Sequence, residues 1–190
     1  MDSQFTVQAH PSSKGLFDCP GYRYSATAVD IRDNQSGQLD IALIVGNTPL
    51  KSAAVFTQND VTAAPVDLCK DILKANPEKI GGIVINSGNA NACTGKQGIA
   101  DAKEMSASAQ VTTKIGLPFY VCSTARIGRK LPIDKISAGI DTCAKALKHC
   151  PEQALQTSQA ILTSDTCEKN ATVTIQYQDK TFTLAGIAKG

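Results

Sequence analysis

Tryptophan is absent from this sequence of 190 residues, and aromatic residues make up only 5% of it. Proteins that bind single-stranded nucleic acid stack bases on aromatic side chains, so this scarcity disfavours that class. The formal net charge is only +2, which is too small to indicate a nucleic-acid surface. No apolar run approaches the roughly 20 residues that a membrane-spanning helix needs. Nucleic acid and membrane are therefore not expected partners.

Metal-binding and secretory patterns are missing as well. The seven cysteines include no Cys-x-x-Cys pair, and both histidines, His10 and His149, are distant from Cys93 and Cys122. This distribution predicts free thiols in a reducing compartment, and neither a zinc site nor a Cys–His nucleophile. Residues 1–14 hold no apolar segment of the secretory type and no arginine. We therefore expect a cytoplasmic protein.

The most informative stretch of the chain runs from Ile83 to Gly95. Three β-branched residues, Ile83 to Ile85, predict a buried strand. The small residues that follow cannot fill a core, but they offer many donors and acceptors. A helix is expected from about Gln97, so backbone N–H groups would meet at a helix start. From these residues alone, an ordinary strand-to-helix loop and a loop that binds a small anion both remain open.

The rest of the chain alternates between strand and helix patterns. Leu39–Val45 would be apolar on both faces of a strand, which places it inside a sheet. A turn is expected at Gly46–Pro49 and a short strand at Ala53–Thr57. Further strands are expected at 22–31 and 119–122. Helices are expected at 65–75, at 97–115, from Leu131 and from Pro151, and a hairpin is expected at 171–188. We predict a single α/β or α+β domain over residues 1–190, with mixed sheets, packed helices and an N-terminal arm at 1–20.

Several motifs resemble one known family in order and spacing. The ten residues Asn86–Gly95 (Asn-Ser-Gly-Asn-Ala-Asn-Ala-Cys-Thr-Gly) closely resemble the signature of the ornithine acetyltransferases, also called bifunctional glutamate N-acetyltransferase/amino-acid acetyltransferase. Shorter resemblances lie at Pro20–Arg23, Ala53–Thr57, Ala63–Val66, Ser123–Gly128, Thr163–Thr166 and Gly186–Gly190. A ten-residue match accompanied by shorter matches in the same order along the chain is far more specific than a lone glycine motif.

The resemblance implies a precursor that cleaves itself at an Ala-Thr bond into an α chain and a β chain. This chain resembles the α chain, with Gly190 expected shortly before the cleavage point. The nucleophile, the new N-terminal Thr of the β chain, would then lie outside this sequence. The implied architecture is an N-terminal-nucleophile fold built by both chains, and family members commonly form a dimer of αβ heterodimers. The implied reaction is ping-pong transfer of acetyl from N2-acetylornithine to glutamate in arginine biosynthesis, with no metal or organic cofactor.

The resemblance also implies roles for particular residues. The hydroxyl of Thr124 and the backbone N–H of Ala125 would form the oxyanion hole. Thr163 and Lys189 would contact substrate, and a lysine suits an α-carboxylate. The family usually has Gly where this chain has Ala125, so a positive φ there would add about 1–2 kcal/mol of strain. From the residues alone, alternatives remain open: Thr124 could belong to a Ser/Thr pair that caps the next segment, Thr163 could be a polar residue at a helix end, and Lys189 could be a solvated lysine.

Two features flank the expected oxyanion hole. Asn89 and Asn91 are expected to fix neighbouring backbone and not to touch substrate. Arg126, Arg129 and Lys130 form a basic cluster, which either steers anionic glutamate or is a solvated turn.

Two other functions remain alternatives. One is an N-terminal-nucleophile amidase or aminopeptidase, in which water replaces glutamate as the acyl acceptor. The other is a non-catalytic domain that binds a small anion at the helix start. The chain carries neither GxxxxGK[ST] nor a strand-linked GxGxxG, which disfavours the second alternative.

Overall fold

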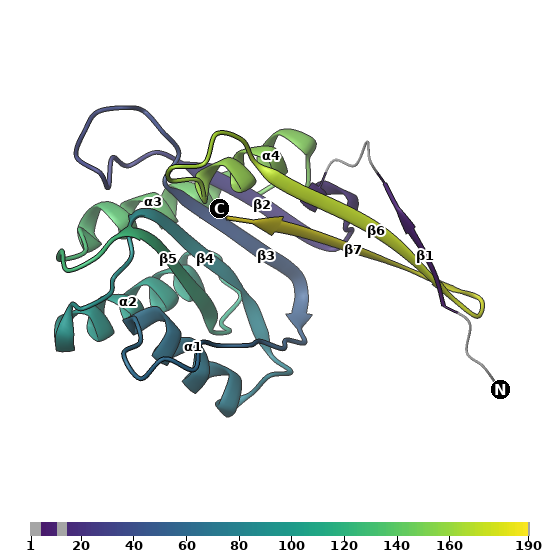
Figure 1. Ribbon diagram of the computed structural model, residues 1–190, viewed down its shortest axis with the longest axis horizontal. Helices are drawn as coiled ribbons and strands as arrows, with labels where there is room; N and C mark the ends of the chain where they lie inside the picture. The colour runs from purple at the N-terminus through teal and green to yellow at the C-terminus, as the bar shows by residue number, and fades with distance from the viewer. Residues whose placement is uncertain (1–4, 11–14, 190) are drawn as a thin grey trace.

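The computed structural model describes residues 5–10 and 15–189 and shows two β-sheets with helices packed around the larger one (Figure 1). The larger sheet has the strand order β2-β3-β4-β5, formed by Tyr22–Thr27, Ile41–Leu50, Ile80–Asn89 and Phe119–Arg126. Its β4 and β5 run parallel, and the other neighbours are antiparallel. The smaller sheet has the order β1-β6-β7, formed by Thr6–Ala9, Lys169–Tyr177 and Lys180–Ala188.

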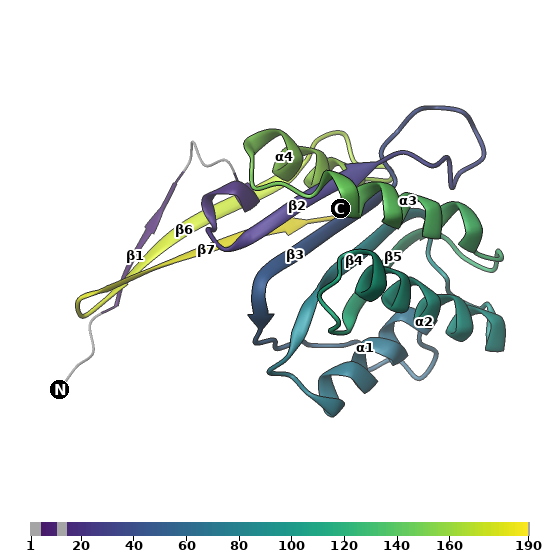
Figure 2. The same ribbon diagram turned by 180° about the vertical axis from the view of Figure 1, so that it is seen from behind.

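Helices cover the two faces of the larger sheet unequally. One face carries α1 (Ala64–Ala75), α2 (Gly95–Thr112) and α3 (Ile133–Ala146), of which α2 and α3 lie in front in Figure 2. The other face carries α4 (Pro151–Ala160) and the end of β7. The turn end of the β6–β7 hairpin extends away from the helices in both views, and a short 3-10 helix, η1 (Gly15–Asp18), precedes β2.

The central position expected for the strand at Leu39–Val45 is confirmed. Ile41 and Leu43 of β3 are fully buried against α2 and α3. Ala42 faces the opposite side and is also fully buried, in a cluster that includes Ile85 and Ile161. A strand that is buried on both faces needs apolar residues at every position, which is the pattern of this segment.

The second cluster joins segments that are distant in sequence. Ile187, near the end of β7, packs against the same cluster as Leu162, just after α4. The end of β7 and the turn after α4 therefore lie beside one another, over the side of the sheet that α1–α3 do not cover.

Two expectations about the segment after β3 are wrong. The turn expected at Gly46–Pro49 is part of β3, which continues to Leu50 and pairs there with Ile80 after a shift in register. The strand expected at Ala53–Thr57 is an irregular connection to α1, and Val55 is 97% exposed. Strand propensity was not sufficient there because the described chain offers this segment no neighbouring strand.

The first expected strand is shorter than its pattern predicted. It ends at Thr27, and residues 28–40 form a long loop that returns to β3. The helices expected at 65–75, 97–115 and from Leu131 and Pro151 are confirmed within a few residues, as is the hairpin near the end of the chain.

The arm expected at 1–20 is only partly described, because residues 1–4 and 11–14 lie outside the described ranges. Its β1 pairs with β6, placing Val7 opposite Ile175. Leu16 in η1 packs against Tyr24, whose hydroxyl donates to the Leu16 carbonyl at 2.6 Å. The division into one domain with an arm stays a prediction.

Candidate active site

The predicted oxyanion residues lie where the parallel strands β4 and β5 end. Thr124 is paired with Ser87, and Ala125 is paired with Gly88. The register then shifts, so that Asn89 is paired with residues on both sides of Ala125. Such a bulge changes the direction of the backbone and of the groups it presents.

The backbone at this bulge adopts an unusual conformation on both strands. Ala125 has φ +108° and Gly88 has φ +100°. An L-residue rarely adopts such a φ, and strain of this kind costs on the order of 1–3 kcal/mol. The strain expected at Ala125, if φ there were positive, is therefore present in the structure.

The side chain of Thr124 points away from α1–α3. Val121, three positions earlier on β5, is buried in the core beneath these helices. Because side chains alternate along a strand, Thr124 lies on the opposite face, together with Ser87 of the neighbouring strand. Both Thr124 and Ala125 are half-buried. Each residue therefore keeps part of its surface exposed, and the Thr124 side chain lies on the face that α4 and the end of β7 cover.

The asparagines of the signature stretch bind backbone, as expected. The Asn89 side-chain amide donates to the carbonyls of Arg129 (3.2 Å) and Lys130 (3.0 Å), and its carbonyl oxygen accepts the Asn91 N–H at 2.8 Å. The Asn91 amide in turn donates to the Gly98 carbonyl in α2 at 2.8 Å. These buried contacts hold the segments after β4 and after β5 together.

Arg32, which the sequence patterns did not indicate, links β4 to the turn after α4. Its Nη2 donates to the Leu162 carbonyl at 2.9 Å and to Ser87 Oγ at 3.3 Å. Its stem lies over Gly88, where an added Cβ would come within 3.0 Å of Arg32 Cγ. No signal in the sequence could have identified Arg32, because its partners lie 55 and 130 positions away.

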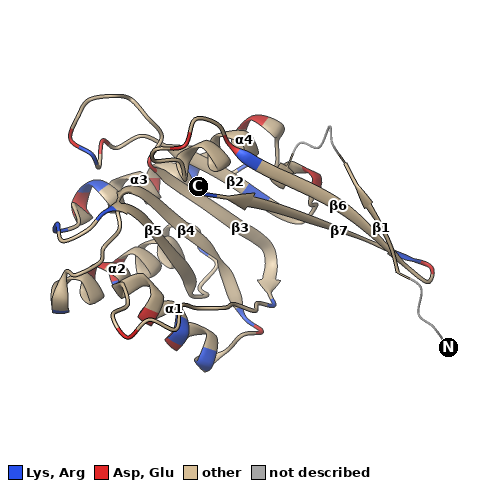
Figure 3. Cartoon of the chain, in the orientation of Figure 1, with Lys and Arg blue, Asp and Glu red and all other residues tan. Residues whose placement is uncertain are grey.

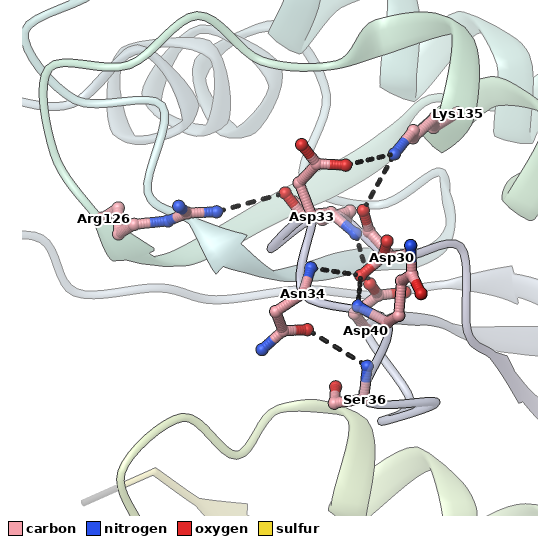
Figure 4. Close-up of polar contacts among 9 residues, drawn as sticks. Asp30, Asp33, Asn34, Ser36, Asp40, Arg126 and Lys135 are labelled. Carbon is pink, nitrogen blue, oxygen red and sulfur yellow. Dashed lines mark hydrogen bonds and ion pairs between the residues drawn. The ribbon is translucent and has the colours of Figure 1, made fainter.

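The loop that carries Arg32 is held in shape by a buried carboxylate. Asp40 is 1% exposed and accepts the N–H groups of Val29 (2.8 Å) and Ile31 (2.7 Å). Between these two residues, Asp30 accepts the N–H of Asn34, and this hydrogen bond lowers the pKa of the Asp30 carboxyl (Figure 4).

Two side chains from other elements fasten the same loop from outside (Figure 4). Arg126 donates to the carbonyl of Ile31 at 3.3 Å and to that of Gly88 at 3.1 Å. Lys135 donates to the Asp30 carbonyl at 3.1 Å and lies 3.6 Å from an oxygen of Asp33.

Two neighbouring hollows open between this loop and the strand ends. One, of about 310 Å³, is lined by Arg32, Asn34, Gly88, Ala125 and Arg126. The other, of about 370 Å³, shares Arg126 and collects the basic side chains of the next segment, which are Arg129, Lys130 and Lys135. Basic positions on the segment after β5 and at the start of α3 are visible in Figure 3. A larger, mostly apolar hollow of about 580 Å³ lies between β7 and the sheet, and its lining includes none of the predicted site residues.

The other two predicted site residues lie near the ends of α4 and β7. Thr163 directly follows the carbonyl that Arg32 binds, and its N–H donates to Asp165 at 3.3 Å. Lys189 follows β7, two positions after Ile187, which packs beside Leu162. The fold thus brings both residues toward the same side of the sheet as Thr124, and their contact with substrate stays a prediction.

The described residues hold no cluster of three or more His, Cys, Asp or Glu side chains placed to bind a metal ion. Over the same residues, no helix combines the length and the apolar character needed to cross a bilayer. What the strand ends do offer is a hydroxyl and a backbone N–H beside a basic hollow. Donors of this kind stabilise negative charge that develops on oxygen, so the site suits a group-transfer enzyme that proceeds through an oxyanion.

The comparisons with known proteins identify the family. The sequence model of the ArgJ family matches residues 23–190, and the chain belongs to that family. The arginine biosynthesis bifunctional protein ArgJ of Symbiobacterium thermophilum is 39% identical over 90% of this chain, and that of Shouchella clausii is 36% identical over 100% of this chain. The chain covers 42% and 45% of these relatives, so it spans less than half of their length.

Solved structures confirm the predicted fold class. The ArgJ protein of Bacillus halodurans is similar with a TM-score of 0.89 and 33% identity, over 98% of this chain and 95% of that one. The ornithine acetyltransferase of Mycobacterium tuberculosis, solved in complex with ornithine, is similar with a TM-score of 0.84 and 31% identity, over 97% and 95% of the two chains. The mixed α/β architecture is therefore that of the ArgJ proteins, which have the N-terminal-nucleophile fold.

Proposed function

We propose that this chain is the α subunit of an acetyltransferase that moves acetyl from N2-acetylornithine to glutamate. Membership of the ArgJ family and the likeness to a named ornithine acetyltransferase support the reaction class. The observation that carries the role of this chain is the bulge at Thr124 and Ala125, where φ of Ala125 is +108°. A residue held in such a conformation indicates a function for the backbone at that point.

In the proposed mechanism, the N-terminal Thr of the β chain attacks the acetyl carbon of N2-acetylornithine. The carbonyl oxygen becomes an oxyanion, which the Thr124 hydroxyl and the Ala125 N–H stabilise by donating hydrogen bonds. One such donor contributes roughly 3–4 kcal/mol to transition-state stabilisation. The C–N bond then breaks, ornithine leaves with the proton taken from the threonine hydroxyl, and an acyl-threonine remains.

The second half of the reaction uses the same donors. The amine of glutamate attacks the acyl-threonine, a second oxyanion forms in the same hole, and N-acetylglutamate leaves as the threonine hydroxyl is restored. Thr163 and Lys189 are the proposed substrate contacts, with the lysine ammonium opposite an α-carboxylate. This scheme needs no metal or organic cofactor.

The remaining parts of the proposal concern assembly and location. The partner is a β chain cut from the same precursor, and the assembly is a dimer of αβ heterodimers. We propose a cytoplasmic location, although a relative from Uncinocarpus reesii is named as a mitochondrial ArgJ protein.

The test of this proposal uses the full gene product. We expect two bands after purification and formation of N-acetylglutamate and ornithine from N2-acetylornithine and glutamate. Acetate in place of N-acetylglutamate would instead identify an N-terminal-nucleophile hydrolase. A single uncleaved band without acetyl transfer would contradict the proposal.

A further inference from the structure

The hollow of about 310 Å³ beside Ala125 has a chemical character that the proposed oxyanion hole does not explain. Of its five lining residues, Arg32 and Arg126 are cationic, and none of the described residues that line it is acidic. An oxyanion hole needs only hydroxyl and N–H donors. Two guanidinium groups next to it would suit a further negative charge, because hydrogen bonds from arginine to a carboxylate are strong.

Both guanidinium groups are held in place by hydrogen bonds to backbone carbonyls, and Arg32 also donates to a serine hydroxyl. Arg32 is tied to Leu162 and Ser87 through Nη2 alone. Arg126 is tied to Gly88 through Nε and to Ile31 through Nη2. No residue of the described ranges accepts from the remaining N–H groups, which are Nε and Nη1 of Arg32 and Nη1 of Arg126. Anchored guanidinium groups with unused donors are pre-organised for a carboxylate.

The surroundings of the hollow carry further positive charge. The neighbouring hollow shares Arg126 and adds Arg129 and Lys130, for which the described chain shows no ion-pair partner. Its Lys135 faces one carboxylate, Asp33, at 3.6 Å, and that side chain is 89% exposed. The lining of this second hollow therefore holds four basic side chains and one acidic side chain, and a concave region with such an excess of positive charge attracts anionic ligands.

We infer that the hollow lined by Arg32 and Arg126 binds the side-chain carboxylate of the acyl acceptor, and that Arg32 determines the preference for an acidic acceptor. This inference rests on the proposed function, since it assigns a second part of the same site. A volume of about 310 Å³ admits a carboxylate together with the methylene groups that carry it and some water. The side chain of the donor, N2-acetylornithine, is cationic and gains nothing from these two arginines.

The test compares glutamate with glutamine as acceptors in the assembled full-length protein. Glutamine has nearly the same shape as glutamate but carries a neutral amide in place of the carboxylate, so the ratio of their kcat/KM values reports the recognition of the carboxylate. We expect Arg32→Met to reduce this ratio at least tenfold and to leave kcat/KM for N2-acetylornithine unchanged, because in a ping-pong reaction that parameter does not depend on the acceptor. Arg32→Lys retains a positive charge, so we expect the preference for glutamate to remain even if both rates fall.

Arg23→Met is the matched control, because it removes the same charge from β2, where Arg23 contacts Asn47, away from the hollow. We expect it to leave the ratio unchanged. If Arg32→Met lowers the rates with glutamate and glutamine equally, Arg32 only supports the fold and the inference is wrong. A parallel fall in kcat/KM for N2-acetylornithine would also overturn it, because the hollow would then take the α-carboxylate that both substrates share. Absence of acetyl transfer by the wild type would instead contradict the proposed function.

Discussion

Replacing Ala125 with glycine should stabilise the protein, although the same change normally weakens a strand. At φ +108° the Cβ of Ala125 is in a conformation that costs on the order of 1–3 kcal/mol, and glycine has no Cβ to strain. Glycine also makes the unfolded chain more flexible, which offsets about 0.4–1 kcal/mol of the gain. The expected net result is a stabilisation of about 0.5–2 kcal/mol, which corresponds to a rise in Tm of a few degrees at most.

The measurement is thermal unfolding of the assembled protein, with an alanine-to-glycine change on an ordinary strand as the control. Ala26 is half-buried in β2 and is not among the residues with positive φ. We expect Ala26→Gly to lower the stability by about 0.5–1 kcal/mol. Because the N–H at position 125 remains, Ala125→Gly should retain acetyl transfer. A loss of stability as large as that of Ala26→Gly would show that Ala125 is not strained, and the reasoning would fail.

Three further changes probe the surroundings of the site. Gly88→Ala places a Cβ at φ +100° and within 3.0 Å of Arg32 Cγ, so we expect a loss of about 1–3 kcal/mol in chemical denaturation. Asp40→Asn replaces one of two buried acceptor oxygens with an NH2 group that faces the N–H of Val29 or of Ile31. We expect the free energy of unfolding to fall by about 2–3 kcal/mol, and activity to fall because the loop at 28–40 shifts. Burial raises the pKa of the Cys143 thiol to about 12. The folded state therefore holds this proton more tightly than the unfolded state does, and the free energy of unfolding falls as pH rises from about 9 toward 12. Cys143→Ala should make that decline shallower between pH 8 and 11, and an unchanged slope would contradict this cause.

The sequence predicted the elements that depend on local pattern. Ile83–Ile85 lies in a buried strand, and the two apolar faces of Leu39–Val45 correspond to two separate clusters in the structure. The errors at Gly46–Pro49 and Ala53–Thr57 arose where the structure depends on contacts with distant parts of the chain and not on local pattern. Whether a segment pairs as a strand depends on a neighbour, and neither turn residues nor β propensity reveal which neighbour is available.

The site divides in the same way. Thr124 and Ala125 were identified from their motif. Strain was expected at Ala125 only if its φ were positive, and the structure has φ +108° there. Arg32 was not found, because its role comes from two contacts that the loop at 28–40 creates across the fold. A buried carboxylate, Asp40, sets the path of that loop, and a lone aspartate before an apolar run carries no signal of this kind.

The most direct test of the central claim is the turnover number of the Thr124→Val variant in acetyl transfer from N2-acetylornithine to glutamate. Valine keeps the shape of threonine and removes only the hydroxyl, and Thr124→Ser, which retains a hydroxyl, serves as the control. With rates normalised to the fraction of processed protein, we predict a loss of about 100- to 1000-fold in kcat for Thr124→Val and a much smaller change for Thr124→Ser. A Thr124→Val enzyme that turns over at the wild-type rate would show that this hydroxyl stabilises no oxyanion.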